Sequence, residues 1–289
     1  MIFKLQPILL EKIWGGNQLK TTFNTNLENI GEVWGISAHV NASNKLNETN
    51  KTLRDLYKEE RHYFGNYPKD EFPILMKLID AKEDLSVQVH PNDTYANQYN
   101  SLGKEECWYV LDAKNDAEIL IGHQAESKDI LEKAIKSDSI MHMMKKYPIK
   151  SGDYFYIKAG TIHAILKNTL ILEVSQSSDI TYRLFDYHRL DKYGQKRELH
   201  IKQSLDVMHF PDLPIEKTHQ NTYFKFEIKQ NKSDTHLIAD QYGDYIGITK
   251  GSGTINDQHL KFGDFFMISA QDTYVLSGNF EYVNVQLVL

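Results

Sequence analysis

Cysteine is nearly absent from this chain of 289 residues, and so is any long apolar segment. The single cysteine, Cys107, excludes a disulfide within the chain and is typical of proteins from a reducing compartment. No apolar run approaches the roughly 18 residues of a membrane span, and charged residues interrupt the apolar start at Lys4, Glu11 and Lys12. These absences predict a cytoplasmic protein without a membrane partner.

An excess of positive charge is also missing. The chain has 33 basic and 39 acidic residues, which gives a formal charge of −6. Such a balance disfavours nonspecific binding to nucleic acid, and a phosphorylated ligand would need a local group of positive side chains. The apolar content of 41% is enough for a substantial core in one large or two smaller domains.

What the sequence does contain is many short strands, separated by glycine, asparagine and aspartate turns. Segments such as "LSVQVH", "CWYVLDA", "AEILIGH" and "LILEVSQ" predict a β-sandwich or barrel. Helical patterns are expected in two insertions, at about 51–65 and 127–147, and in a short helix after Asp93. The first insertion opens with a capping-box pattern at Thr52 and Asp55, and the second has a break near Asp138.

Two segments of the chain repeat one pattern. "SGDYFYIKAGTIHAI" and "FGDFFMISAQDTYVL" align when Gly152 is placed on Gly263, and His163 then falls on Tyr274. Each has a Gly-Asp turn, a strand, a small-residue turn and a second strand. The repeat predicts two related β units, of which the second lacks the histidine.

The strand "LSVQVH" carries polar side chains on one face. Successive residues of a strand point to opposite sides, so Ser86, Gln88 and His90 share a face. Glu106 opens the next strand, and His163 follows a turn of small residues. Two imidazoles, a carboxylate and an amide oxygen suit a catalytic zinc ion. The alternative is a pair of hydrogen-bonded core histidines, and the joint pattern favours the metal.

Lys77 lies in the otherwise apolar strand "ILMKLID". Burial of an unpaired ammonium group is costly, so a partner is expected. A bound phosphate and a buried carboxylate would serve equally well.

These motifs resemble a known family. "GDYFYIKAGTIHAILKN" is similar to the second conserved motif of the cupin superfamily, with Lys158 where proline is usual. "LSVQVHPND", "GKEECWYVLDA", "AGTIHAI", "LEVSQSSDITYRLFDYHR" and "RELHI" together resemble the short bacterial class of type I mannose-6-phosphate isomerases. Gln88 stands where the first cupin motif usually has histidine, and this departure points to the same branch.

The resemblance implies a mainly β fold. It places a catalytic cupin jelly-roll barrel with the helical insertions in residues 1–212. A smaller, degenerate cupin unit without a metal site would follow in residues 213–289.

The resemblance also implies the site. One zinc ion per chain would have four ligands, which are Gln88, His90, Glu106 and His163. Three charged residues would be catalytic, namely Arg183, Lys104 and Glu173. Three further residues would bind the substrate, namely Ser86, Lys77 and Arg189.

The implied reaction interconverts mannose 6-phosphate and fructose 6-phosphate by proton transfer through an enediol. Zinc and Arg183 would stabilise the negative charge that develops on the substrate oxygens. The sequence does not identify the base that carries the proton, and the candidates are Glu173, Lys104 and a zinc-bound water. The expected partner is a phosphorylated sugar, with the protein a monomer or homodimer.

Other functions remain to be weighed against this one. A cupin oxygenase would use iron and oxygen, but Gln88 and the basic residues around the site argue against it. A metal-binding cupin that recognises sugar phosphates without catalysis would be expected to lack ligands or the catalytic basic residue, and here all are present. An isomerase of a different phosphorylated aldose is the third alternative.

Overall fold

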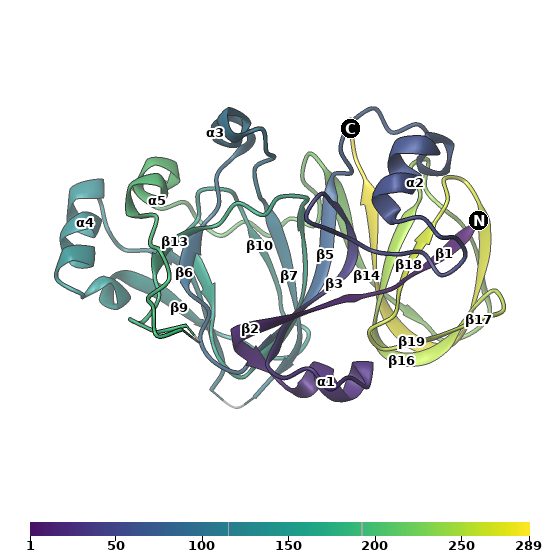
Figure 1. The fold of residues 1–289 in the computed structure, drawn as a ribbon, viewed down its shortest axis with the longest axis horizontal. Helices are drawn as coiled ribbons and strands as arrows, with labels where there is room; N and C mark the ends of the chain where they lie inside the picture. Colours follow the sequence, from purple (N-terminus) through teal and green to yellow (C-terminus); the bar gives the residue numbers. More distant parts are fainter. Residues whose placement is uncertain (115, 192) are drawn as a thin grey trace.

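The computed structural model describes residues 1–114, 116–191 and 193–289, and it consists of two β units that lie side by side (Figure 1). The mainly β fold class predicted from the sequence is confirmed. Among the described residues, no helix combines the length and the apolar character needed to cross a membrane.

The described residues form three sheets. The first unit has a seven-stranded sheet in the order β10-β7-β12-β5-β2-β3-β4, made of β10 (Tyr154–Ile157), β7 (Glu106–Ala113), β12 (Thr169–Gln176), β5 (Ile74–Ala81), β2 (Ile8–Gly16), β3 (Ile30–His39) and β4 (Ala42–Ser43). Its second sheet has the order β13-β6-β11-β8-β9, made of β13 (Tyr182–Phe185), β6 (Val87–Val89), β11 (His163–Ile165), β8 (Glu118–His123) and β9 (Met144–Pro148). The other unit is a seven-stranded sheet made of β1 (Ile2–Leu5), β14 (Phe224–Asn231), β15 (Thr235–Ile238), β16 (Asp244–Ile255), β17 (Gln258–Lys261), β18 (Phe265–Ile268) and β19 (Thr273–Leu287).

The central strands of the first unit are buried on both faces. In β5, Met76 and Leu78 belong to a large apolar core, while Lys77 points to the opposite face. In β12, Leu172 and Val174 face the same core. This is why the apolar strand "ILMKLID" can contain a lysine: one face packs against the second unit, and the other lines the interior of the barrel.

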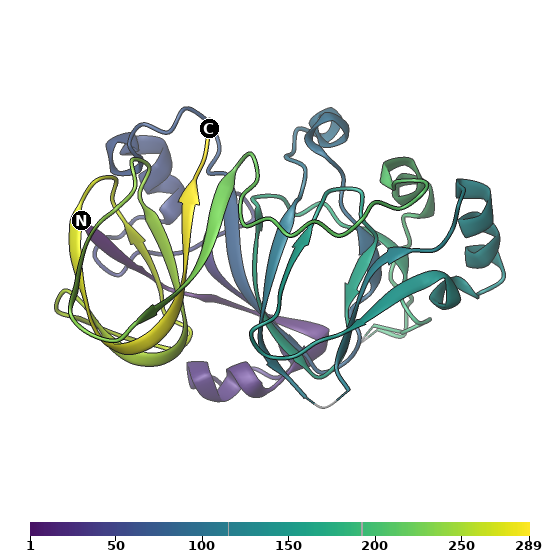
Figure 2. The same ribbon diagram turned by 180° about the vertical axis from the view of Figure 1, so that it is seen from behind.

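The same core joins the two units. It contains Met76 and Leu172 from the first unit and Phe226, Phe265 and Val283 from the second. β1 adds to the connection because it pairs with β18 although it opens the chain, and Figure 2 shows it reaching the C-terminal sheet from the far side. A boundary near residue 212 stays a prediction, and the pairing of β1 was not predicted.

The helices partly follow the predicted insertions. The described helices are α1 (Gln18–Phe23), α2 (Leu53–Glu59), α3 (Asp93–Ala96), α4 (Lys128–Lys136) and α5 (Ile201–Val207), with 3₁₀ helices η1 (Arg61–Phe64), η2 (Asn97–Tyr99) and η3 (Ile140–Met143). The capping box at Thr52 and Asp55 is present at the start of α2. Asp138 breaks the second insertion with a φ of 58°.

The expectation of helix up to about residue 147 is wrong. Met144–Pro148 forms β9 and pairs with β8, in a register that places Tyr147 opposite Ile119. Its residues are alternately buried or half-buried and exposed, which suits an edge strand better than a helix. Pairing with β8 therefore outweighs the local helical pattern.

Both halves of the sequence repeat have the same local geometry. Gly152 and Gly263 have φ values of 92° and 84°, in the region that favours glycine. Their N–H groups donate to the carbonyl oxygens of Val110 in β7 and Ile248 in β16, at 2.8 and 3.0 Å.

Candidate metal centre and active site

A cavity of about 290 Å³ opens inside the barrel of the first unit. Its walls come from β2, β3, β5, β6, β7, β11, β12 and β13, with Trp14 and Trp108 among the lining side chains. Both tryptophans are buried and also form part of the cavity wall.

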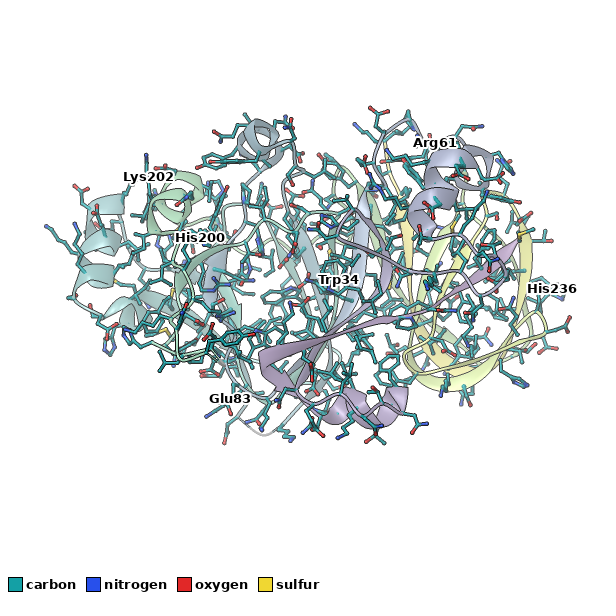
Figure 3. All side chains as sticks on the ribbon, viewed as in Figure 1. Trp34, Arg61, Glu83, His200, Lys202 and His236 are labelled. Atoms are coloured by element: carbon teal, nitrogen blue, oxygen red, sulfur yellow. The ribbon has the colours of Figure 1, made fainter. Side chains whose placement is uncertain are left out.

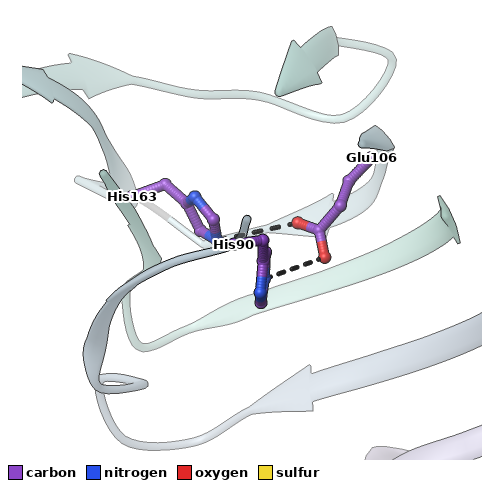
Figure 4. Close-up of side chains that lie close together, drawn as sticks. All are labelled: His90, Glu106 and His163. Carbon is purple, nitrogen blue, oxygen red and sulfur yellow. Dashed lines mark ion pairs between the residues drawn. The ribbon is translucent and has the colours of Figure 1, made fainter. Parts of the chain in front are cut away.

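His90, Glu106 and His163 meet behind Gln88 and Lys104, two side chains that line this cavity. Their ligand atoms all lie within 4.8 Å of one another, and all three side chains are buried (Figure 4). His90 Nε2 is 3.2 Å and His163 Nε2 is 3.7 Å from carboxylate oxygens of Glu106. Among the described residues, this group could hold a metal ion.

Backbone carbonyls orient the two imidazoles. Nδ1 of His90 lies 2.8 Å from the carbonyl oxygen of Ile180, and Nδ1 of His163 lies 2.8 Å from that of Thr161. A carbonyl can only accept, so each Nδ1 carries the proton when the ring is neutral and each Nε2 presents a lone pair. Burial lowers the pKa of both histidines, that of His90 to about 4, so both are neutral near pH 7.

This arrangement fits a cation. The Nε2 lone pair of His90 and an oxygen of the Glu106 carboxylate face each other at 3.2 Å without a proton between them. Two acceptors at that distance repel unless a positive charge lies nearby. Burial alone would raise the pKa of Glu106, but Lys104 and His90 hold it well below its ordinary value, which keeps the carboxylate ionised. Neutral imidazoles and a carboxylate are the ligand forms that a divalent metal requires.

Gln88 lies beside this group. It stands opposite His163 in the pairing of β6 with β11, and its side-chain amide lies 3.5 Å from His163 Nε2. Ser86 donates to the amide oxygen at 3.4 Å, so the two side chains share the face expected from the alternation in "LSVQVH". The structure therefore brings the four expected ligands together.

Charged side chains form a row along one wall of the cavity and continue to Glu106. Lys77 on β5 stands opposite Glu173 on β12, and its Nζ is 3.0 Å from Glu173 Oε1. Lys104 lies 3.7 Å from the same oxygen and 2.9 Å from Glu106. The sequence left two partners open for Lys77, a bound phosphate and a buried carboxylate. The structure shows the carboxylate, which is that of Glu173.

The cavity is more positive than the rest of the chain. Its lining contains five cationic side chains, which are Lys12, Lys77, Lys104, Arg183 and Arg197. It contains three acidic ones, which are Glu32, Glu173 and Asp179. The lining thus has two more positive than negative groups, in a chain whose formal charge is −6.

The three arginines of this region have different positions. Arg183 lines the cavity, and its Nη1 donates to the carbonyl oxygen of Glu198 at 2.9 Å. Arg189 is absent from the lining, because its guanidinium donates to the carbonyl oxygen of Asp84 and to the carboxylate of Asp186. Arg197 lines the cavity instead, and its Nε donates to Asp186 at 2.7 Å. A substrate role for Arg189 stays a prediction.

Sequence reasoning missed Arg197 and Glu32. Arg197 opens the motif "RELHI", which was quoted for the family resemblance, but no role was assigned to any residue of that motif. Glu32 could have been found, since it interrupts the apolar strand "IGEVWGISAH" just as Lys77 interrupts its own.

The chain matches a known family. Residues 2–137 match the phosphomannose isomerase type I catalytic domain. The chain is 39% identical over 253 residues to the probable mannose-6-phosphate isomerase GmuF of Bacillus subtilis, covering 85% of this chain and 78% of the relative. It is 47% identical over 210 residues to the mannose-6-phosphate isomerase of Streptococcus mutans, covering 71% of this chain and 66% of the relative.

Solved structures are similar over the full length. The crystal structure of the mannose 6-phosphate isomerase from Bacillus subtilis matches with a TM-score of 0.93 and 35% identity, covering 99% of both chains. A putative mannosephosphate isomerase from Archaeoglobus fulgidus shares the fold, with a TM-score of 0.84 and 20% identity over 100% of this chain and 98% of that one.

Proposed function

We infer the reaction from one premise: the chain belongs to the type I phosphomannose isomerase family, and is therefore an aldose–ketose isomerase. We propose that it interconverts mannose 6-phosphate and fructose 6-phosphate. The observation that carries the proposal is a cavity with an excess of positive side chains, one of which, Lys104, lies 2.9 Å from Glu106 of the buried His/Glu/His group. A phosphorylated sugar would place its anionic group among those cations.

We propose zinc as the metal, held by Gln88, His90, Glu106 and His163. When bound, the ion would supply Lewis acidity toward the substrate oxygens at C1 and C2. Nitrogen and oxygen donors of this kind are ligands that zinc accepts, and the neutral imidazoles support this assignment.

The proton would be carried by Glu173. The carboxylate takes the proton from C2 of the open-chain aldose, the C–H electron pair forms the C1–C2 double bond, and the oxygen at C1 takes up a proton. The enediol then loses the hydroxyl proton at C2, and Glu173 returns its proton to C1. Of the cavity carboxylates, Glu32 is fixed by Trp34 and Lys12, whereas Glu173 lies next to Lys104 at the metal centre.

Two cations would stabilise the charge that develops during this transfer. Lys104 lies between Glu173 and Glu106, where its ammonium group can donate to a substrate oxygen. Arg183 approaches from β13 and keeps its positive charge at any working pH. Ser86 and Lys77 line the same cavity and would contact the substrate.

A coupled assay tests this function. The protein is stripped of metal, supplied with zinc, iron or manganese in turn, and given mannose 6-phosphate with an enzyme system that reports fructose 6-phosphate. Turnover restored by zinc is the expected result. Binding of the sugar phosphate without product under all metals would contradict the proposal, as would oxygen uptake with iron.

A further inference from the structure

Tyr223 connects the second unit to the loop that precedes β7. Side chains occupy the boundary between the two units, near the middle of the molecule where Trp34 lies (Figure 3). Tyr223 stands just before β14, where its N–H donates to Asn221 at 2.8 Å and its carbonyl oxygen accepts from Val288 N at 2.9 Å. Its hydroxyl leaves this unit and donates to Oδ2 of Asp93, the first residue of α3. The second unit thus holds a residue of the first one through a side-chain hydrogen bond.

Asp93 closes the loop that carries Lys104. Its other carboxylate oxygen, Oδ1, accepts from Gly103 N at 2.8 Å and from Gln176 Nε2 at 3.0 Å. The two ends of the loop are in close contact, because a Cβ on Gly103 would lie 2.5 Å from Asp93 N. Gln176 is the buried last residue of β12, and its Oε1 accepts from Glu105 N at 3.0 Å. Both chain neighbours of Lys104 are therefore fixed on groups that meet at Asp93.

Lys104 is held between these two contacts. Its own N–H donates to the carbonyl oxygen of Pro91 at 2.9 Å, so the three successive N–H groups of residues 103–105 all have acceptors. Its ammonium group is buried, 2.9 Å from Glu106 and 3.7 Å from Glu173. The lysine side chain is long and flexible, so a fixed backbone is needed to hold its ammonium group at one place.

We propose that Tyr223 is a positioning residue for Lys104. Through Asp93 it fixes the backbone on both sides of this lysine, and the ammonium group therefore stays where it can donate to a substrate oxygen. The residues that line the cavity all come from the first unit, so the second unit takes part in the reaction without contacting the substrate. The inference rests on the proposed function, since it assumes that Lys104 acts on the substrate.

The test compares Tyr223→Phe with Tyr274→Phe, each loaded with zinc. Both substitutions remove a hydroxyl that donates to an aspartate, but Tyr274 donates to Asp244 within the second unit, at 2.7 Å. We expect Tyr223→Phe to lower kcat by about tenfold or more, with KM and zinc content unchanged, because a misplaced group costs transition-state stabilisation. The amides of residues 103–105 should also exchange faster in this variant. Tyr274→Phe should keep the parental kcat and the parental exchange of these amides.

A double-mutant cycle separates positioning from a merely structural role. If Tyr223 acts through Lys104, Tyr223→Phe should lower kcat much less in a Lys104→Met background than in the parent protein. Equal losses in both backgrounds would overturn the proposal. Unchanged kcat or unchanged amide exchange in a folded Tyr223→Phe variant would overturn it as well, whether or not Lys104→Met turns over. Absence of turnover in the zinc-loaded parent protein would instead overturn the proposed function, and amide exchange alone would then show whether Tyr223 fixes the loop.

Discussion

Arg183 reaches the cavity from β13, with one guanidinium nitrogen fixed on the carbonyl oxygen of Glu198. It contacts none of the proposed metal ligands through its side chain in the described structure. Substitution by alanine should therefore lower kcat by about 10²–10³-fold, the cost of losing one preorganised charge in a transition state. Metal content, measured by atomic emission, should not change.

Arg54→Ala is the control for this variant, since it removes an arginine that pairs with Glu71 outside the cavity. It should turn over like the parent protein. Full activity of Arg183→Ala would contradict the assignment, and loss of the metal would show a structural role instead.

The pKa of Glu32 also predicts how stability depends on pH. Its folded-state pKa of about 2 lies below the ordinary value of 4.5, so the unfolded chain binds this proton more readily. The associated stabilisation is present above pH 4.5 and is lost as the pH falls toward 2. It amounts to at most about 3 kcal/mol.

Glu32→Gln lacks this contribution. Its free energy of unfolding, measured in urea between pH 6 and 3, should lie below that of the parent protein at pH 6 and approach it as the pH falls. Glu198→Gln changes a side chain that is 83% exposed and should follow the parent curve. A constant gap between Glu32→Gln and the parent would contradict the prediction.

At the scale of residues, the sequence predicted which side chains share one face of a strand, where the alternation of polar and apolar neighbours shows it. The alternation in "LSVQVH" placed Ser86, Gln88 and His90 on one side, and the structure has them so. Which arginine enters the cavity could not be predicted, because Arg189 and Arg197 both bind Asp186 and only the fold of their loop separates them.

At the scale of elements, the two halves of the repeat differ in their polar centres. Val110 and Ile248 accept equivalent hydrogen bonds, from Gly152 and Gly263. Four residues before them, Glu106 at the start of β7 therefore corresponds to Asp244 at the start of β16. Tyr274, the counterpart of the site histidine, donates to Asp244 at 2.7 Å. The second unit thus has a phenol–carboxylate hydrogen bond at the place where the first unit has its metal-binding group.

Tyr274→Phe should therefore destabilise the protein without affecting zinc. The buried Asp244 would lose a donor, at a cost of about 1–3 kcal/mol in the free energy of unfolding. Tyr147→Phe is the control, because its hydroxyl has no hydrogen bond to any residue that the structure describes. Unchanged stability of Tyr274→Phe in urea would contradict the importance of this contact.

The capping box of α2 gives a second prediction for an element. Thr52 accepts from the N–H of Asp55 at 3.2 Å, and the Asp55 carboxylate accepts from the N–H of Thr52 at 2.9 Å. Thr52→Ala should cost about 1 kcal/mol in urea unfolding. Thr222→Ala removes an exposed hydroxyl that has no hydrogen bond within the described part of the chain, so it should cost nothing measurable. Equal effects of the two substitutions would contradict the prediction.

Local patterns predicted α2 correctly because its cap lies within the helix sequence. They did not predict α1, whose first N–H groups are satisfied from a distant strand: Asp80 accepts from Gln18 N at 2.8 Å. They also failed at β9, where pairing with β8 decides the structure. Elements fixed by contacts far along the chain leave no local signal.

For the whole molecule, we propose that residues 1–212 and 213–289 are two units of one cooperative body, with β1 attached to the second. They share a single apolar core, which reaches from β5 and β12 to β14, β18 and β19. All three tryptophans, Trp14, Trp34 and Trp108, precede residue 109, so their fluorescence reports the first unit alone. Fluorescence and amide exchange of β16–β19 should give one coincident urea transition.

Gly35 tests this coupling, because the Phe265 ring of β18 packs directly against β3 at this position. A Cβ at position 35 would lie 2.3 Å from ring atoms of Phe265, so Gly35→Ala forces the two sheets apart. The cost should be about 1–3 kcal/mol, and both probes should report it equally, since the core belongs to both units. Phe265→Leu shortens the opposing side chain, so the double variant should lose less stability than the sum of the single ones. Strict additivity, or a shift seen by only one probe, would mean that the two units unfold independently.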